Sequence, residues 1–347
     1  MIRPRRLQAG DRVAAVTLSW GGPGAIPHRY LAGKQQLQDE FGLTVVETPH
    51  ALRSAEWLAR NPRARAEDLM GAFADPSIRG IVSTIGGDES IRLLPHLDLN
   101  VIRDNPKVFL GYSDTTITHL ACYRAGLVSF YGPAIMAGFG ENGGLFPYMV
   151  DSVRRTLFQA QAVGEVLPNT QGWTVEHLPW ENPDNQAVRR ALNPSTGWRF
   201  LQGTGVRRGR LIGGCLEVLD WLRGTALWPS PNQWQDAILF LETSEGAPPP
   251  AAVRSFLRTL AALGGLPRLA GILFARPGGQ VPPSRFPEYD QALLDIVAGE
   301  EGLTDLPIVT NMDFGHTDPM FVLPYGVLAE IDCPARRFSI VESAVVE

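Results

Sequence analysis

Short apolar segments alternate with segments of helical spacing along the chain, and this alternation constrains the fold more than any other feature. In the first half, strands are expected at 13–18, 43–47, 80–85 and 107–111, and helices at 30–41, 64–74 and 115–125. Strands that are separated by helices pair in parallel, because each helix returns the chain to the same end of the sheet. The sequence therefore predicts an α/β protein built on a parallel sheet.

The same alternation resumes after a long interruption. Strands are expected at 209–212, 237–242, 270–275 and 307–310, helices at 216–223 and 251–263, and an antiparallel pair from 327 onward. Between these halves Pro, Asn, Trp and Gly dominate and neither period is sustained, which is typical of a long functional connection. We expect an N-terminal domain over 1–165, a connecting insert or substrate flap over 166–207, and a C-terminal α/β domain over 208–347.

Length and charge exclude several classes of protein. A chain of 347 residues suits two domains, and a net charge of −5 gives no electrostatic reason to expect a nucleic acid polymer or a membrane surface as partner. No apolar segment follows the N-terminal arginines as it would in a signal peptide. Three widely spaced cysteines favour neither a disulfide framework nor a zinc site. We expect a cytoplasmic protein that needs no metal.

The strongest local motif is a serine on a turn between a buried strand and a helix. Ser113 follows the strand that ends at Gly111, and the helical pattern starts two residues later. Such a turn exposes the serine oxygen and places the next N–H, that of Asp114, at a helix N-terminus that can bind an oxyanion. The alternative is that Ser113 or Asp114 merely caps the helix.

An acid and a histidine follow two other strands. Glu242 ends the strand over 237–242, and His316 lies in a loop rich in Gly, Asp and Pro after the strand over 307–310. Taken singly, Glu242 is better explained as a salt-bridged strand end, Glu245 as a first-turn helix acid, and His316 as a surface histidine. Together with Ser113 they give the order Ser, Glu, His of several hydrolases, in which a carboxylate orients the imidazole that activates the serine.

The residues also resemble a known family. The matching segments are STIGGDES (83–90), FLGYSDTT (109–116), FYGP (130–133), GWRFLQGTG (197–205), GRLIGGCLEVL (209–219), ILFLETSE (238–245) and DFGHTDPM (313–320). In these segments the chain resembles the LD-carboxypeptidases, and more closely the subgroup that includes the microcin C self-immunity protein.

The resemblance implies a fold and a set of roles. The fold would be a flavodoxin-like, parallel-sheet N-terminal domain and a smaller α/β domain of the swivelling β/α/β type, with the site between them. Ser113 would be the nucleophile, His316 the general base and Glu242 its orienting carboxylate, with the N–H groups of Gly87 and Asp114 as the oxyanion hole. The resemblance also implies a homodimer without a cofactor.

Family substrates divide into murein tetrapeptides and peptidyl- or aminoacyl-nucleotide analogues. The GGDES segment, the long insert and GGCLEVL resemble the second group, so we expect cleavage of an amide in such a conjugate. Asp88, Trp180 and Glu217 are the candidate substrate contacts, with Trp180 stacking on a nucleobase. Interdomain packing is the alternative for Trp180, and a solvated helix position is the alternative for Glu217.

Two other functions also fit this sequence. One is a murein tetrapeptide LD-carboxypeptidase that releases terminal D-Ala. The other is a non-catalytic, two-lobed binding protein, because two α/β domains around a cleft also fit that class.

Overall fold

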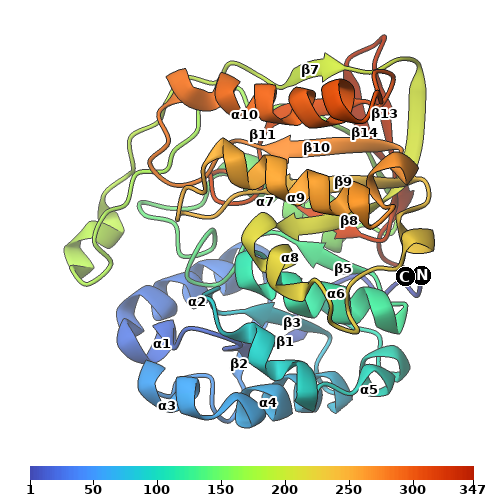
Figure 1. The fold of residues 1–347 in the computed structure, drawn as a ribbon. Helices are drawn as coiled ribbons and strands as arrows, with labels where there is room; N and C mark the ends of the chain where they lie inside the picture. The colour runs from blue at the N-terminus through green and yellow to red at the C-terminus, as the bar shows by residue number, and fades with distance from the viewer.

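The computed structural model describes all 347 residues, which form two lobes stacked on each other (Figure 1). The first lobe is built on a six-stranded sheet of order β12-β5-β4-β3-β1-β2. Its strands are β1 (Arg12–Val16), β2 (Thr44–Glu47), β3 (Gly80–Ser83), β4 (Val108–Gly111), β5 (Ser129–Tyr131) and β12 (Leu323–Tyr325). All neighbours pair in parallel except β12, which runs antiparallel to β5. Every residue of β3, β4 and β5 is buried, as expected for parallel strands covered on both faces.

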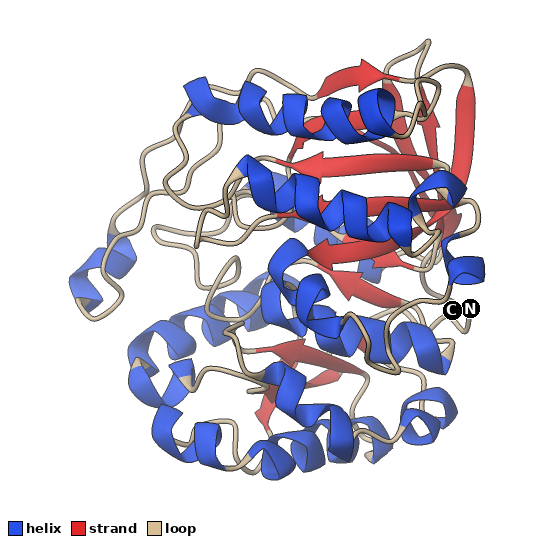
Figure 2. Ribbon diagram, viewed as in Figure 1, coloured by secondary structure: helices blue, strands red, loops and turns tan.

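Helices surround this sheet (Figure 2). They are α1 (Gly22–Ala25), α2 (Pro27–Phe41), α3 (Ala55–Arg60), α4 (Pro62–Ala74), α5 (Leu99–Asp104), α6 (Thr116–Ala125) and α7 (Pro147–Leu157). Prolines open α2, α4 and α7, where the missing N–H removes no helical hydrogen bond. Glycines in the left-handed conformation, Gly42 and Gly126, end α2 and α6.

The second lobe contains an eight-stranded sheet of order β6-β14-β13-β8-β9-β10-β11-β7. Its strands are β6 (Ala162–Val166), β7 (Arg199–Gln202), β8 (Val206–Cys215), β9 (Ala237–Glu242), β10 (Gly271–Ala275), β11 (Ile308–Met312), β13 (Leu328–Asp332) and β14 (Arg337–Ser343). Strands β8 to β11 are parallel and the outer strands antiparallel. Its helices are α8 (Leu216–Leu222), α9 (Pro250–Ala262) and α10 (Phe286–Leu294).

Short 3-10 and π segments complete the secondary structure. The 3-10 segments are η1 (Ser90–His96), η2 (Ser113–Thr115), η3 (Pro183–Ala187), η4 (Pro231–Trp234), η5 (Leu266–Arg268) and η6 (Pro283–Arg285), and the π segment is η7 (Asp295–Glu300). No helix combines the length and the apolar character needed to cross a lipid bilayer. The predicted α/β class with two sheets is confirmed, although the second sheet, expected in the smaller part, has more strands than the first.

Two strands cross between the lobes. β6 pairs with β14 of the second sheet although it precedes the insert, and β12 returns to pair with β5 of the first. The expected boundary between residues 165 and 166 therefore falls inside β6. Within the expected insert, β7 pairs with β11, so the end of this segment is part of the second sheet. The domain division itself stays a prediction.

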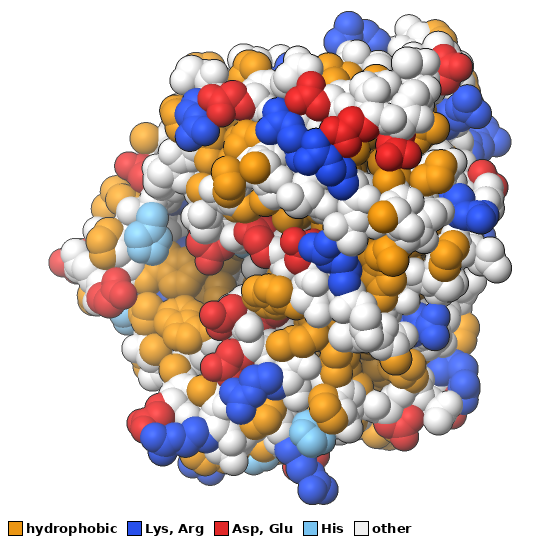
Figure 3. All heavy atoms as spheres, in the orientation of Figure 1, with side chains coloured by type: hydrophobic (Ala, Val, Ile, Leu, Met, Phe, Trp, Pro, Cys, Tyr) orange, Lys and Arg blue, Asp and Glu red, His pale blue; other side chains and the backbone are white.

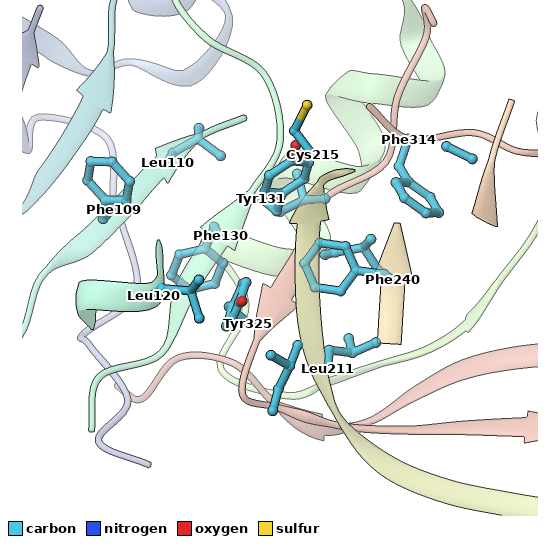
Figure 4. Packing of buried hydrophobic residues seen from close by; sticks show 14 of the residues in the cluster. Phe109, Leu110, Leu120, Phe130, Tyr131, Leu211, Cys215, Phe240, Phe314 and Tyr325 are labelled. Carbon is cyan, nitrogen blue, oxygen red and sulfur yellow. The ribbon is translucent and has the colours of Figure 1, made fainter. Parts of the chain in front are cut away.

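Aromatic side chains fill the seam between the two sheets (Figure 4). Tyr131 of β5 packs on Phe240 of β9 with ring centroids 5.3 Å apart, and Phe240 packs on Tyr325 of β12 at 5.4 Å. These residues belong to one continuous buried cluster that includes both lobes. Because the seam is packed, the ends of β4 and β9 are held in a fixed relation to each other.

Candidate active site

Ser113 lies on the turn between β4 and α6 with a left-handed backbone, φ 63°. This conformation is rare for a residue with a side chain, and it is typical of nucleophile turns between a strand and a helix. The turn is fixed by its own hydrogen bonds. The Ser113 N–H donates to Tyr131 Oη at 3.0 Å, and Thr116 Oγ1 donates to the Ser113 carbonyl at 2.7 Å.

His316 joins Ser113 to Glu242 across the seam. Its Nε2 lies 3.0 Å from Ser113 Oγ, and its Nδ1 lies 2.6 Å from Glu242 Oε2. A carboxylate can only accept, so Nδ1 carries a proton. Glu242 is fully buried and its second oxygen accepts a hydrogen bond from Tyr131 Oη at 2.5 Å. The three predicted residues therefore form one hydrogen-bonded series, with Tyr131 linking its two ends.

Gly315 permits the approach of the histidine loop to Glu242. Its φ is +80°, and a Cβ added there would lie 2.6 Å from the Cβ of Glu242. A side chain at this position would push the loop away from the strand end. Glycine next to His316 is thus required by both backbone and space.

Charge controls the protonation of this series. Burial lowers the pKa of His316, but the charge of Glu242 and its hydrogen bond, together with Glu245, raise it to about 10. Burial, with the charge of Glu242, raises the pKa of Tyr131 well above its ordinary value, so this hydroxyl stays a donor. Glu242 and Glu245 thus favour the protonated form of the imidazole.

The Asp114 side chain organises the loop opposite the serine. Its carboxylate accepts hydrogen bonds from the N–H groups of Glu89 at 3.1 Å and Ser90 at 2.9 Å, and from Ser90 Oγ at 2.7 Å. Burial nevertheless raises its pKa. In the same loop, Gly86 approaches the serine so closely that a Cβ there would lie 3.0 Å from Ser113 Oγ. The main-chain N–H groups of Gly87 and Asp114, the predicted oxyanion donors, have no hydrogen-bond partner in the chain.

The predicted substrate contacts have different surroundings. Asp88 is exposed. Glu217 is half-buried and accepts from the N–H of Ser244 at 3.1 Å and from the Ser244 hydroxyl, so it holds the chain that follows Glu242. Glu217 is therefore neither a solvated helix residue nor a free carboxylate, because its oxygens accept hydrogen bonds from Ser244.

Trp180 is half-buried and docked on the first lobe. The guanidinium of Arg29 lies 4.5 Å from the centre of its ring, and its carbonyl is 2.7 Å from His28 Nε2. Arg29 is buried and also donates to Asn142 Oδ1 at 2.5 Å; burial lowers its pKa to about 10. One ring face of Trp180 is thus covered by a cation, an arrangement that strengthens the ring's attachment.

Two neighbours of the series were not singled out from sequence as site residues. Tyr131 lies within the FYGP segment, which indicated the family but gave no contact with Glu242. Glu245 was interpreted as a helix acid, yet its Oε2 lies 3.0 Å from His316 Nε2 while its side chain is 80% exposed. Its position three residues after Glu242 was the available signal.

Cys215, Glu242 and His316 each bring one possible metal-ligand atom within 4.8 Å of the others. Burial, with the charges of Glu242 and Glu217, raises the pKa of the Cys215 thiol well above its ordinary value. Tyr131 and His316 already occupy both oxygens of Glu242.

The side chain of Glu245, next to His316, is exposed to solvent. Figure 3 shows a hollow at the left of the view with an apolar floor and acidic side chains on its rim.

Comparison with known proteins decides the family. The model of the LD-carboxypeptidase N-terminal domain matches residues 13–132, and that of the LD-carboxypeptidase C-terminal domain matches residues 208–331. A Vibrio cholerae protein that bears the name of a carboxypeptidase is 30% identical over 98% of each chain. The chain belongs to the LD-carboxypeptidase family. It is a serine carboxypeptidase-type hydrolase.

Within the family the chain is similar to the microcin immunity subgroup. The microcin C7 self-immunity protein MccF of Escherichia coli is 29% identical over 97% of this chain and 94% of its own. A MccF-like protein of Streptococcus pneumoniae, solved with AMP, has a TM-score of 0.85 and 31% identity and covers 95% of this chain and 98% of its own. MccF solved with glutamyl sulfamoyl guanosine has a TM-score of 0.82 and 27% identity, covering 99% and 100%.

Proposed function

We propose that this LD-carboxypeptidase family member is a serine amidohydrolase that cleaves the amide joining an amino acid or a peptide to a nucleotide-like group. The observation that carries the proposal is the hydrogen-bonded series Ser113, His316, Glu242, with distances of 3.0 Å and 2.6 Å. A serine hydroxyl becomes a nucleophile when an oriented imidazole takes its proton.

The reaction begins with acylation. The neutral His316 Nε2 takes the Ser113 proton while Oγ forms a bond to the amide carbonyl carbon. The carbon–nitrogen bond then breaks, and the same proton passes from Nε2 to the leaving nitrogen. In deacylation His316 takes a proton from water, the hydroxide adds to the acyl carbon, and Ser113 leaves with the proton. Glu242 accepts the hydrogen bond from Nδ1 throughout and stabilises the imidazolium.

Backbone donors supply the electrostatic part of the mechanism. The N–H groups of Gly87 and Asp114 would donate hydrogen bonds to the oxyanion of the tetrahedral intermediate, and their lack of partners in the chain supports this role. Removing one such donor typically lowers kcat by about 100- to 1000-fold, or about 3 kcal/mol.

The nucleotide side of the substrate is argued from relatives and from the insert. MccF and a MccF-like protein, each at least 27% identical to this chain, were solved with glutamyl sulfamoyl guanosine and AMP, respectively. Arg29 covers one face of the Trp180 ring and His177 lies 6.0 Å from its centre, so the remaining ring surface is the candidate for stacking, because aromatic faces stack on any nucleobase. Asp88 and Glu217 stay predictions as substrate contacts, the first exposed beside Gly87 and the second acting through Ser244.

A second candidate is murein peptide carboxypeptidase activity, because a Bacillus subtilis protein named for that activity is 27% identical over 99% of this chain. The homodimer expected from the family and the cytoplasmic location also stay predictions.

The test is a cleavage assay on matched substrates. Wild type, Ser113→Ala and the exposed-serine control Ser284→Ala are incubated with aminoacyl sulfamoyl adenosines, a peptidyl analogue and a murein tetrapeptide, and products and enzyme mass are followed by mass spectrometry. We expect cleavage of the nucleotide conjugates by wild type and the control, with an acyl adduct on Ser113. Preferred release of D-Ala would favour the murein function, and ligand binding without turnover would favour a binding protein.

A further inference from the structure

Glu245 and the proposed nucleophile, Ser113, contact the same nitrogen of His316. Glu245 Oε2 and Ser113 Oγ both lie 3.0 Å from His316 Nε2. An imidazole nitrogen has one proton or one lone pair, so it cannot donate fully to both groups. The two oxygens therefore compete for the same atom.

The contact between Glu245 and Nε2 of His316 requires a protonated imidazole. With Nδ1–H donated to Glu242, a neutral ring presents a lone pair at Nε2, which can accept from Ser113 but repels a carboxylate. The imidazolium, in contrast, donates from Nε2 to Glu245. In agreement, the hydrogen bond from His316 lowers the pKa of Glu245 to about 2, and the two carboxylates together raise that of His316.

His316 must lose this proton before it can act as a base. Its charged and titratable neighbours are Glu242, Glu245 and Cys215, and the ring of Tyr112 packs on it at 5.0 Å. No Lys or Arg forms an ion pair with Glu245. Arg190 is already paired with Glu141 and Asp318.

Glu245 is able to move while its neighbours are fixed. Ser244 is held by Glu217, and Thr243 Oγ1 accepts from the N–H of Gly278 at 3.0 Å. The Glu245 side chain itself is 80% exposed and bonded only to His316. A cation that approaches from solvent can therefore bind the Glu245 carboxylate without disturbing the end of β9.

The distance from Ser113 to Glu245 indicates which cation of a substrate Glu245 can bind. Glu245 Oε2 lies no farther from Ser113 Oγ than the sum of two hydrogen-bond distances, about 6 Å. A reacting carbonyl carbon lies about 3–3.5 Å from the nucleophile, and an α-ammonium nitrogen is two bonds beyond that carbon. The free amine of an aminoacyl group can thus come within hydrogen-bond reach of Glu245.

We propose that Glu245 is a specificity-determining residue for the reaction proposed above, on which this inference rests: its carboxylate binds the free α-ammonium group of an aminoacyl substrate and thereby releases His316. The Nε2 proton leaves to water, because one carboxylate is now neutralised by the substrate and the ammonium stands nearby. Substrate binding and activation of the base are then one event. Aminoacyl conjugates are preferred over peptidyl or N-acylated ones, whose amine at this position is an uncharged amide.

The test uses binding to catalytically blocked protein. On the Ser113→Ala background, affinities of Glu245→Gln and of the exposed-glutamate control Glu56→Gln are measured by calorimetry. The ligands are the aminoacyl sulfamoyl adenosine cleaved fastest in the panel above and its N-acetyl derivative. We expect the parent and the control to prefer the free amine, and Glu245→Gln to reduce that preference at least tenfold.

A second readout follows His316 directly. In Glu245→Gln, the pKa of the imidazole, observed by NMR, is expected to fall relative to the parent. An unchanged preference for the free amine in Glu245→Gln overturns the inference while leaving the proposed function intact. If wild type cleaves no nucleotide conjugate, the proposed function fails and this inference fails with it.

Discussion

Tyr131→Phe tests how the two lobes share the candidate site. The Tyr131 hydroxyl accepts from the Ser113 N–H at 3.0 Å and donates to Glu242 at 2.5 Å, and its ring is buried. Phenylalanine keeps the ring and its contact with Phe240 and removes only the oxygen. The variant leaves one buried N–H without an acceptor and one buried carboxylate oxygen without its donor.

The expected loss follows from these two groups. A hydrogen bond to a charged group contributes about 1.5–3 kcal/mol, and an unsatisfied buried group costs about 1–3 kcal/mol. Because one hydroxyl serves both, we expect the free energy of unfolding to fall by about 3 kcal/mol. We also expect lower kcat, since the serine turn and Glu242 lose their common partner.

The assay is denaturant unfolding, with Tyr123→Phe as the matched control. Tyr123 is half-buried, packs on Tyr325 at 5.7 Å and makes no side-chain hydrogen bond in the chain, so its hydroxyl should contribute little. If the two variants lose stability equally, to within about 0.5 kcal/mol, the reasoning from hydrogen bonds is refuted.

Three further predictions concern the surroundings of the series. Gly315→Ala, which combines positive φ with a clash on Glu242, should destabilise by about 2–4 kcal/mol and abolish most activity, whereas Gly302→Ala, with positive φ and open space, should lose only about 1–2 kcal/mol in denaturant unfolding. Asp114→Asn should lower the free energy of unfolding by about 1–3 kcal/mol and reduce kcat, with exposed Asp104→Asn as an unaffected control. The raised pKa of His316 stabilises the folded state fully below pH 6.5, and this stability is lost as pH rises through about 10, so unfolding free energy should decline over that window in wild type and not in His316→Gln.

The parallel strands could be predicted because they are short, apolar and bounded by glycine or polar residues. Strand β9 was expected at its observed bounds, and β8, expected at 209–212, extends over Val206–Cys215. The chain crossings could not be predicted in this way. β6 pairs with β14 and β12 with β5 across long stretches of sequence, and local periodicity carries no information about such partners.

Helices α7 and α10 were missed for a different reason. In α7 the buried residues Met149, Val153 and Leu157 recur every four positions, so a helical signal was present in the sequence. In α10 the prolines near its start resemble a loop, although proline is compatible with a first helical turn.

Part of the candidate site could likewise be inferred from the sequence, and part could not. Glu242 ends β9 and His316 follows β11, and parallel strands of one sheet bring their carboxyl ends to one edge, so the proximity of these two residues could be inferred. Ser113 follows β4 of the other sheet, and only the order Ser, Glu, His and the family resemblance indicated that it joins them. The contacts of Tyr131 and Glu245 depend on the packing of the seam and on side-chain reach. Those are properties of the folded chain that spacing does not encode.

The central claim is that three side chains from two lobes act as one unit. The most direct measurement is kcat for Ser113→Ala, His316→Ala and the double variant on the same conjugate. Residues that act together are non-additive, so we predict that the double variant is no slower than the slower single variant. If the two losses multiply, His316 does not act through Ser113, and the account is contradicted.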